Sequence, residues 1–221
     1  MVQKLEALLR RLPASHPRHQ EMADQLAKRM AGYKGELSID YHLRPLLKKG
    51  YLILQAVELI AQNLTVAVQQ GSNLEARSNM LLASLLAGIA FSNAGTAAAN
   101  ALGYPIGAVG KSPHGEVTGT LLPYVMEFNT AVSEDKMINI AKAFGIDVDE
   151  LEKREAALEA SKAVKKLLVD IGLPTRLADI GVKEEEIREI ASKTLEITRL
   201  IRNNPRVPNV RDFEKLLREA L

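Results

Sequence analysis

One histidine stands where the sequence could do chemistry. His114 lies between Pro113 and Gly115 in the stretch SPHGEVTGTLLPYVMEFN, and the apolar spacing that follows predicts an amphipathic helix beginning at His114. An imidazole at the mouth of a helix can present a nitrogen to a metal ion or to a substrate. Two interpretations stay open on these residues alone: a working metal ligand, or the remnant of one.

Bulk composition limits what this histidine can belong to. The chain has 221 residues, 47% hydrophobic and 25% charged, which is enough for one sizeable core or two small domains. The formal net charge of +2 demands neither nucleic acid nor an anionic membrane as a partner. Cysteine is absent, which excludes disulfides, thiolate metal sites and cysteine nucleophiles within this sequence and is consistent with a reducing cytoplasm.

The elements that must position His114 are predicted to be helices, and the fold class is all-α, a multi-helix bundle. No segment shows a convincing alternation of period two. The helices are expected at residues 2–11, 18–31, 51–70, 74 to the GYP at 103–105, 114 onward, 133–145 with Ser133 as cap, 149–172, 183–202 and 210–221. Charge divides the chain near residue 50: residues 1–50 hold ten Lys and Arg against five Asp and Glu, whereas residues 51–221 hold nineteen against twenty-two. We therefore expect a helical N-terminal extension, 1–50, and a helical domain, 51–221.

A charge-free run extends from Ser78 to Gly110 and is long enough to cross a bilayer. Its polar residues, among them Asn79, Asn93 and Asn100, would all need hydrogen-bond partners in hydrocarbon. Its many alanines and glycines suit a helix closely surrounded by other helices. The prediction is a buried helix of a soluble protein, with no membrane as partner.

The order of three motifs carries a resemblance to a known family. The run NLEARSNMLLASLLAGIAFSNAG, the triplet PHG and the helix LLPYVMEFN resemble the helical C-terminal domain of the iron-containing alcohol dehydrogenases, and the similarity covers residues 51–221. The resemblance implies an oxidoreductase lineage in which Fe²⁺ or Zn²⁺ polarises an alcohol or carbonyl and NAD(P) exchanges hydride. It also implies a nucleotide-binding domain, and no phosphate-binding glycine loop occurs in these 221 residues.

The family's metal ligands can be carried over position by position. His114 matches the histidine of PHG, and Asn100 stands where the other C-terminal histidine belongs. Tyr104 stands where some members carry a further histidine near the substrate. The Asp and His ligands of an earlier helix fall at Ala31 and Gly35, which cannot bind a metal. Since such sites need three or four protein donors, we interpret His114 as a remnant and expect the chain to be catalytically incomplete by itself.

Residues 1–45 carry a second, shorter resemblance, to the start of nuclease-related domain proteins. Gly35 and Glu36 match the Gly-Glu pair of their early helix, but their later metal-binding strands have no counterpart here, so a chimera is the plainest account.

Two further hypotheses about function remain. A partner chain or a second copy covers an exposed helical face and restores an NAD(P)-dependent alcohol or aldehyde oxidoreductase, or the chain is a protein or nucleic-acid interaction module, with nucleic acid the less favoured partner.

Overall fold

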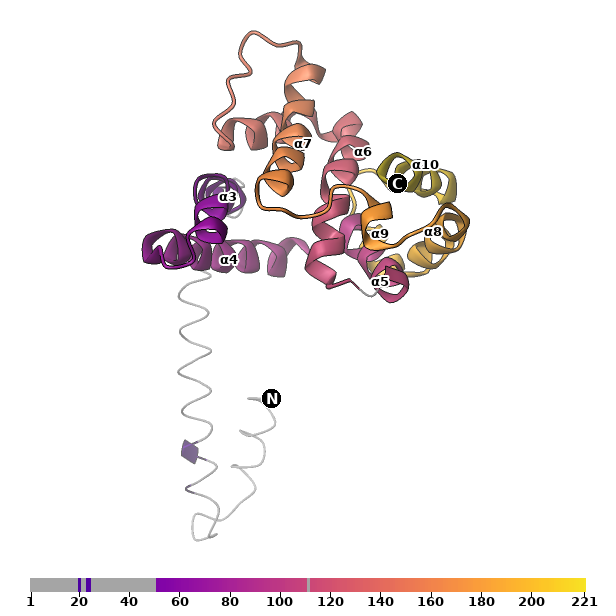
Figure 1. Cartoon of the computed structure of the whole chain (residues 1–221), viewed down its shortest axis with the longest axis horizontal. Coiled ribbons are helices and arrows are strands. Elements are labelled where there is room, and N and C mark those ends of the chain that lie inside the picture. The colour runs from indigo at the N-terminus through magenta and orange to yellow at the C-terminus, as the bar shows by residue number, and fades with distance from the viewer. Residues whose placement is uncertain (1–19, 21–22, 25–50, 111) are drawn as a thin grey trace. The chain divides into compact units, whose positions relative to one another are not determined.

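The computed structural model describes Gln20, Ala23, Asp24, residues 51–110 and residues 112–221 (Figure 1). The chain divides into two compact units, Met1–Tyr51 and Leu52–Leu221. Within the described residues every regular element is a helix, so the all-α prediction is confirmed. The helices predicted at 2–11 and 18–31 lie outside the described residues, apart from Gln20, Ala23 and Asp24, which are helical.

The elements follow one another with short connections. They are α3 (Tyr51–Gln69), α4 (Leu74–Ala94), α5 (Ala98–Gly110), α6 (His114–Ala143), α7 (Lys153–Asp170), the 3₁₀ turns η1 (Leu177–Ile180) and η2 (Glu184–Glu186), α8 (Ile187–Glu196), α9 (Thr198–Ile201) and α10 (Val210–Ala220). The predicted start of a helix at His114 and the predicted ends of α3 and α7 agree with these bounds to within three residues.

The prediction of one helix from Leu74 to the GYP at 103–105 is wrong. The break occurs at Gly95, whose φ of +76° only glycine adopts readily and where a β-carbon would overlap Asn203 Nδ2. The GYP does not end a helix, because α5 continues through Pro105 to Gly110. Proline destabilises a helix interior because it removes one backbone hydrogen bond. In α5 the packing of neighbouring helices offsets this loss of stability.

The main hydrophobic cluster surrounds α5. Leu102 and Ile106 of α5 are fully buried, together with Leu121 of α6 and Phe213 of α10. Because α5 carries no charged residue, it can pack against α6, α8 and α9 without an unpaired charge in the core. The expectation of a buried charge-free helix therefore holds for one side of α5, whereas Tyr104 and Val109 on it are exposed.

A second cluster joins Met126 and the far half of α6 to α7. Met137 and Ala141 of α6 pack with Ala157 and Ala160 of α7. Ser133 has non-helical angles, φ −142° and ψ 28°, so α6 consists of two helices that meet in a kink at the residue predicted to begin the second. Helix α7 begins at Lys153 rather than at the predicted Asp149.

An exposed ion pair lies in the loop before α7. Asp149 Oδ1 lies 2.7 Å from Lys142 Nζ, and this ammonium, by hydrogen bond and by charge, lowers the pKa of the Asp149 carboxyl. The Asp149 side chain thus bonds to the end of α6, and the residue before α7 is Glu152, whose side chain makes no capping bond.

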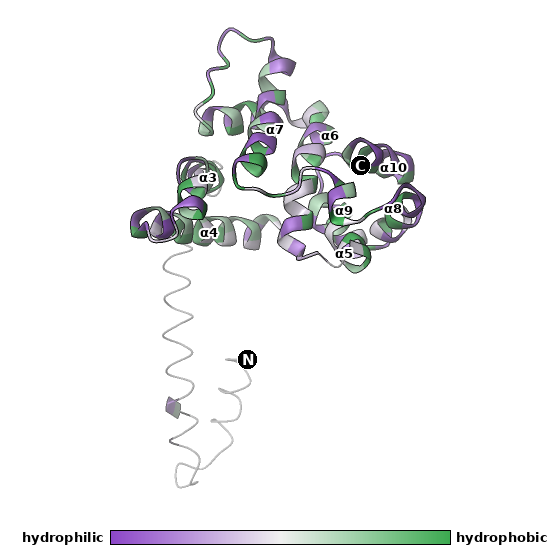
Figure 2. Ribbon diagram, viewed as in Figure 1, coloured by the Kyte–Doolittle hydropathy of each residue, from purple (hydrophilic) through white to green (hydrophobic). Residues whose placement is uncertain are grey.

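Helix α4 departs from the expectation of burial. Only Ala76, Ala83 and Ala90 are buried along it, while Leu81 and Leu85 are 74% and 60% exposed. Figure 2 shows apolar colouring along much of this helix. Helices α3 and α4 are long and apolar enough to cross a membrane, which is weak evidence because core helices of soluble proteins satisfy the same length and composition.

A buried amide pair ties the C-terminal segment to the start of α5. Asn129 Nδ2 donates to Asn204 Oδ1 at 3.2 Å, and Asn204 Nδ2 donates to Asn129 Oδ1 at 2.7 Å and to the Arg206 carbonyl at 2.7 Å. The backbone N–H of Ala98, at the first turn of α5, donates to the same Asn204 oxygen at 3.4 Å. Helix starts leave N–H groups without partners, and Asn204 satisfies one of them inside the protein.

We expect Asn204→Ala to lower the free energy of unfolding by about 2–3 kcal/mol, because it leaves the buried polar groups of Asn129 and Ala98 without partners and removes the bond to the half-buried Arg206 carbonyl. The matched control is Asn93→Ala, since Asn93 is exposed and donates only to a carbonyl of its own helix. Urea unfolding followed by circular dichroism measures both variants. Equal effects of the two substitutions would contradict the role given to Asn204.

Candidate functional site

Helices α5 and α6 bring together the three residues singled out in the sequence. Asn100 and Tyr104 are four residues apart on α5 and share a face of it, while His114 is the first residue of α6. His114 Nε2 lies 3.2 Å from Asn100 Oδ1. The rings of Tyr104 and His114 have centroids 5.4 Å apart and are tilted by 39°. Asn100 is half-buried and His114 is exposed, so the group lies at the surface of the helical unit.

Gly103 lets the imidazole approach α5. A β-carbon at this position would lie 2.8 Å from His114 Cε1 and 3.0 Å from His114 Nδ1, closer than real contacts allow. Thr118, one turn along α6, presses on the same glycine and donates its hydroxyl to the His114 carbonyl at 2.8 Å. Gly103 and Thr118 are thus positioning residues that sequence reasoning missed. The glycine of GYP was interpreted there as a helix stop, and its close approach to an imidazole has no sequence signal.

The hydrogen bond occupies one nitrogen of the imidazole. With the amide oxygen of Asn100 as acceptor, Nε2 is the donor. The arrangement links α5 to α6 by a direct polar contact.

The donor set does not fit a resident divalent metal. The 3.2 Å between Nε2 and Oδ1 is close to the separation of about 3.3 Å between two ligands of a tetrahedral ion with bonds of about 2.0–2.1 Å. Spacing is thus suitable, but one imidazole and one amide are too few, and the amide oxygen is a weaker donor for iron or zinc. Among the residues that the structure describes, no three His, Cys, Asp or Glu side chains gather to hold an ion.

The remaining ligand positions cannot add donors. Ala31 and Gly35 lie outside the described residues, and their side chains carry no metal-binding atom. Tyr104 is 58% exposed and its ring borders His114, which is the placement expected of a substrate-proximal residue. The ligand role of His114 and Asn100 and the substrate role of Tyr104 stay predictions.

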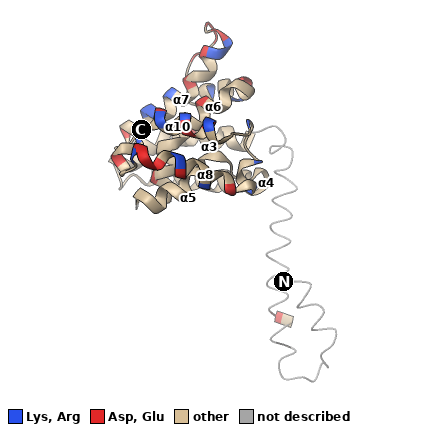
Figure 3. Cartoon of the chain, turned by 90° about the vertical axis from the view of Figure 1, so that its right-hand side faces the viewer, with Lys and Arg blue, Asp and Glu red and all other residues tan. Residues whose placement is uncertain are grey.

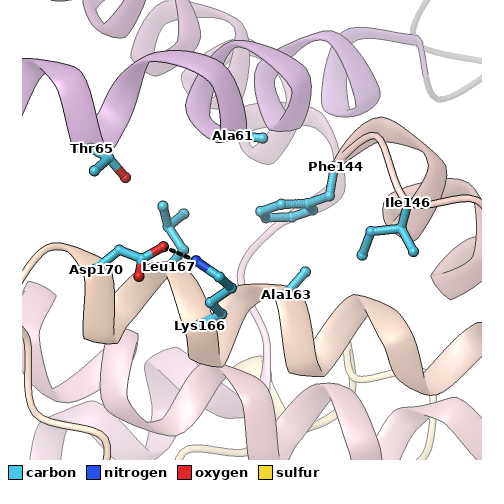
Figure 4. Close-up of a pocket in the computed structure, with 8 residues that line it drawn as sticks. All are labelled: Ala61, Thr65, Phe144, Ile146, Ala163, Lys166, Leu167 and Asp170. Atoms are coloured by element: carbon cyan, nitrogen blue, oxygen red, sulfur yellow. Dashed lines mark hydrogen bonds and ion pairs between the residues drawn. The ribbon is translucent and has the colours of Figure 1, made fainter.

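A separate hollow lies between α3 and the α6–α7 connection (Figure 4). It has a volume of about 230 Å³ and is lined by Ala61, Thr65, Phe144, Ile146, Ala163, Lys166, Leu167 and Asp170. Its ionic groups, Lys166 and Asp170, bind each other one turn apart on α7, as the dashed line in Figure 4 shows. Since no charge is left to orient a ligand, this open apolar hollow does not make a second catalytic site.

Comparison of the sequence with known protein families finds one family model that matches most of the chain. The model described as "Fe-containing alcohol dehydrogenase family, C-terminal" matches residues 49–221. The chain is 40% identical over 167 residues to 1,3-propanediol dehydrogenase of Citrobacter freundii, covering 76% of this chain and 43% of that protein. It is 33% identical over 169 residues to lactaldehyde reductase of Escherichia coli K12, covering 76% and 44%.

Solved structures agree with the sequence relatives. A 1,3-propanediol oxidoreductase superposes with a TM-score of 0.74 at 38% identity, over 77% of this chain and 44% of that one. An alcohol dehydrogenase from Oenococcus oeni superposes with a TM-score of 0.75 at 35% identity, over 78% and 45%. The chain thus spans less than half the length of the relatives that it matches.

We expect Gly103→Ala to displace His114 and break its bond to Asn100, because the added methyl group would overlap the ring. Overpacking of this kind costs about 1–3 kcal/mol of unfolding free energy, more than alanine returns in helix propensity. Gly115→Ala is the matched control, since a β-carbon there meets nothing within 4 Å. Denaturant unfolding and the imidazole ¹⁵N shifts of His114 measure both effects. Unchanged His114 shifts in Gly103→Ala would refute the packing argument.

Proposed function

Because the chain belongs to the iron-containing alcohol dehydrogenase family, we propose that it is a helical metal-site domain of that oxidoreductase lineage and is inactive when alone. The observation that carries the proposal is the hydrogen bond between His114 and Asn100, which joins two groups where the family resemblance implies metal ligands. The share of 43–45% of the relatives' lengths that the chain covers supports it further.

The complete oxidoreductase would act on a small alcohol or aldehyde with NAD(P). Relatives of this chain are named for 1,3-propanediol, methanol and lactaldehyde, and we infer a substrate of that class for the assembled enzyme. Fe²⁺ or Zn²⁺ would have to gain donors from outside the described residues. In such an assembly Tyr104 borders the substrate, and the reducing cytoplasm is the compartment that fits a chain without cysteine.

A second candidate, completion by a partner chain, is favoured by the exposed face of α4. Leu81 and Leu85 stand in solvent on a helix whose composition is that of a core helix. A chain that supplies the nucleotide-binding part would then restore activity in a mixture. The proposal for the isolated chain and this candidate are compatible, since one concerns the chain alone and the other an assembly.

Metal retention tests the interpretation of His114 as a remnant. We expect well under one zinc or iron ion per chain after loading and dialysis, measured by mass spectrometry, because two weakly suited donors do not form a closed site. Asn100→His should raise zinc affinity at least ~10-fold, since a second imidazole replaces the amide at ligand spacing. Asn93→His, which places a histidine on the exposed face of α4, is the control. One firmly held ion in the unmodified chain, lost in His114→Ala, would overturn the proposal.

Activity of the purified chain is the second test. Reduction of propionaldehyde or lactaldehyde with NADH or NADPH should not exceed the rate without protein, in the presence of either metal, and His114→Ala should change nothing. Loss of absorbance at 340 nm measures the rate. A rate that the unmodified chain sustains and His114→Ala abolishes would show a working site.

A further inference from the structure

Helices α3 and α4 form a hairpin, residues 51–94, that lies outside both apolar clusters. The cluster around α5 begins with Ala98 and the cluster shared with α7 begins with Met126, so neither includes a residue of the hairpin. In the described part of the chain, the elements whose backbones pack closely on one another all belong to residues 98–220. The buried side chains of the hairpin are Leu52 and Ala56 of α3 and three alanines of α4. Little apolar packing therefore fastens the hairpin to the helices that follow it.

Polar bonds join the two helices of the hairpin to each other. Asn79 Nδ2 of α4 donates to Asn63 Oδ1 of α3 at 3.0 Å, and Asn63 Nδ2 donates to the Leu59 carbonyl at 2.9 Å. At the turn between the helices, Arg77 Nη1 donates to the Gly71 carbonyl at 3.2 Å. Because these bonds connect α3, the turn and α4, the hairpin is able to move as one body.

Charge does not fasten the hairpin to the rest of the unit. Helix α3 carries one charged residue, Glu58, and α4 carries Glu75 and Arg77, and Figure 3 shows most charged side chains on other helices. The ion pairs between described residues all lie within residues 134–219. Gln69 Nε2 donates to the Asp170 carbonyl across the gap to α7 at 3.5 Å. This bond is weak, because ~2.9 Å is the usual length.

The hollow of about 230 Å³ separates α3 from α7 and leaves room for the two helices to approach. Ala61 and Thr65 line it on the side of α3, and Phe144, Ile146 and Leu167 line it on the other side. Figure 4 shows the Phe144 ring between the two helices. All five side chains are half-buried, so closing the hollow would remove further apolar surface from water. Such burial stabilises by about 25 cal/mol per Å² of apolar surface.

The connection between α4 and α5 has the properties of a hinge. Residues 95–97 are not helical, and Gly95 has a φ of +76°. Immediately after it, Asn203 Nδ2 donates to the Thr96 carbonyl at 3.2 Å, and the Ala98 N–H donates to Asn204. The side-chain hydrogen bonds described for α4 stay within residues 51–94. The chain is thus held from Thr96 onward, and rotation about Gly95 would move the hairpin while α5 stays in place.

We propose that the α3–α4 hairpin is a hinged lid, which turns as one body about Gly95 and closes onto α7 across the hollow. The closed state buries Phe144 and Leu167 against Ala61 and Thr65, and the open state leaves them in contact with water. Hinges of this kind absorb the rotation in a few residues between two elements. The inference goes beyond the proposed function and does not depend on whether His114 binds a metal.

Distances between spin labels on the full 221-residue chain measure the motion, and the absence of natural cysteine lets labels be placed at chosen sites. One pair, Leu81→Cys with Val207→Cys, joins the hairpin to the loop before α10. The control pair, Val169→Cys with Val207→Cys, lies entirely outside the hairpin, and all three side chains are exposed. Pulsed electron paramagnetic resonance should give a distribution at least ~2-fold wider for the first pair, because only that pair spans the hinge. Equal widths would overturn the proposal.

A substitution at the hinge tests its position with the same labels. Gly95→Ala should shift the distances between positions 81 and 207, since a β-carbon there is strained by the positive φ and would lie 2.4 Å from Asn203 Nδ2. Gly71→Ala is the matched control, because a β-carbon in the turn of the hairpin meets nothing within 4 Å, and it should leave the distances unchanged. Equal shifts in the two variants would refute the hinge at Gly95.

A disulfide across the hollow tests the direction of closure. Thr65→Cys with Leu167→Cys should form an intramolecular bridge under mild oxidation, because both residues line the hollow and closure brings their helices together. Thr65→Cys with Val169→Cys is the control, since Val169 is exposed two positions further along α7 and faces away from Leu167. A bridge needs α-carbons within about 7 Å. If the first pair bridges no faster than the control, measured by the mass of the oxidised chain, closure onto α7 is wrong.

Discussion

The reciprocal amide pair between Asn129 and Asn204 is the contact on which the rest of the helical unit depends. One oxygen of Asn204 accepts from both α6 and the first turn of α5, and its nitrogen holds the following loop at Arg206. This loop leads into α10, which packs on α6 and α8 and whose Phe213 is fully buried in the same cluster as Leu102 and Ile106 of α5. Through one buried side chain the C-terminal segment is fastened where it can enclose α5, and α5 in turn carries Asn100 and Tyr104 to His114.

The geometry at His114 joins α5 to α6 by one polar contact. The separation of 3.2 Å between His114 Nε2 and Asn100 Oδ1 would suit two ligands of one ion, and in the structure it is a hydrogen bond. Such a bond links the two helices by itself. The close approach of Gly103 to the imidazole would be needed for either role of His114.

The sequence predicted two features of the structure. The apolar periodicity predicted the helical class, and the family resemblance predicted the grouping of Asn100, Tyr104 and His114. It failed where a long-range contact decides a local outcome. Gly95 ends α4 with a positive φ against Asn203, a residue more than a hundred positions away, and the burial of α5 lets Pro105 stay helical. The exposure of α4 was also not predicted. The apolar composition of this helix indicates that another apolar surface should cover it, but it does not identify that surface.

Helix α6 takes part in both apolar clusters, and they adjoin before its kink at Ser133. Val125 belongs to the cluster around α5, whereas Met126 belongs to the cluster shared with α7. Helix α7 also bonds to the first part of α6, where Lys165 Nζ donates to the Tyr124 hydroxyl and Ser161 Oγ donates to Glu127 Oε1. Because the two clusters share one stretch of helix, the segment around α5 and the α7 hairpin are expected to open together, as one cooperative unit in amide exchange.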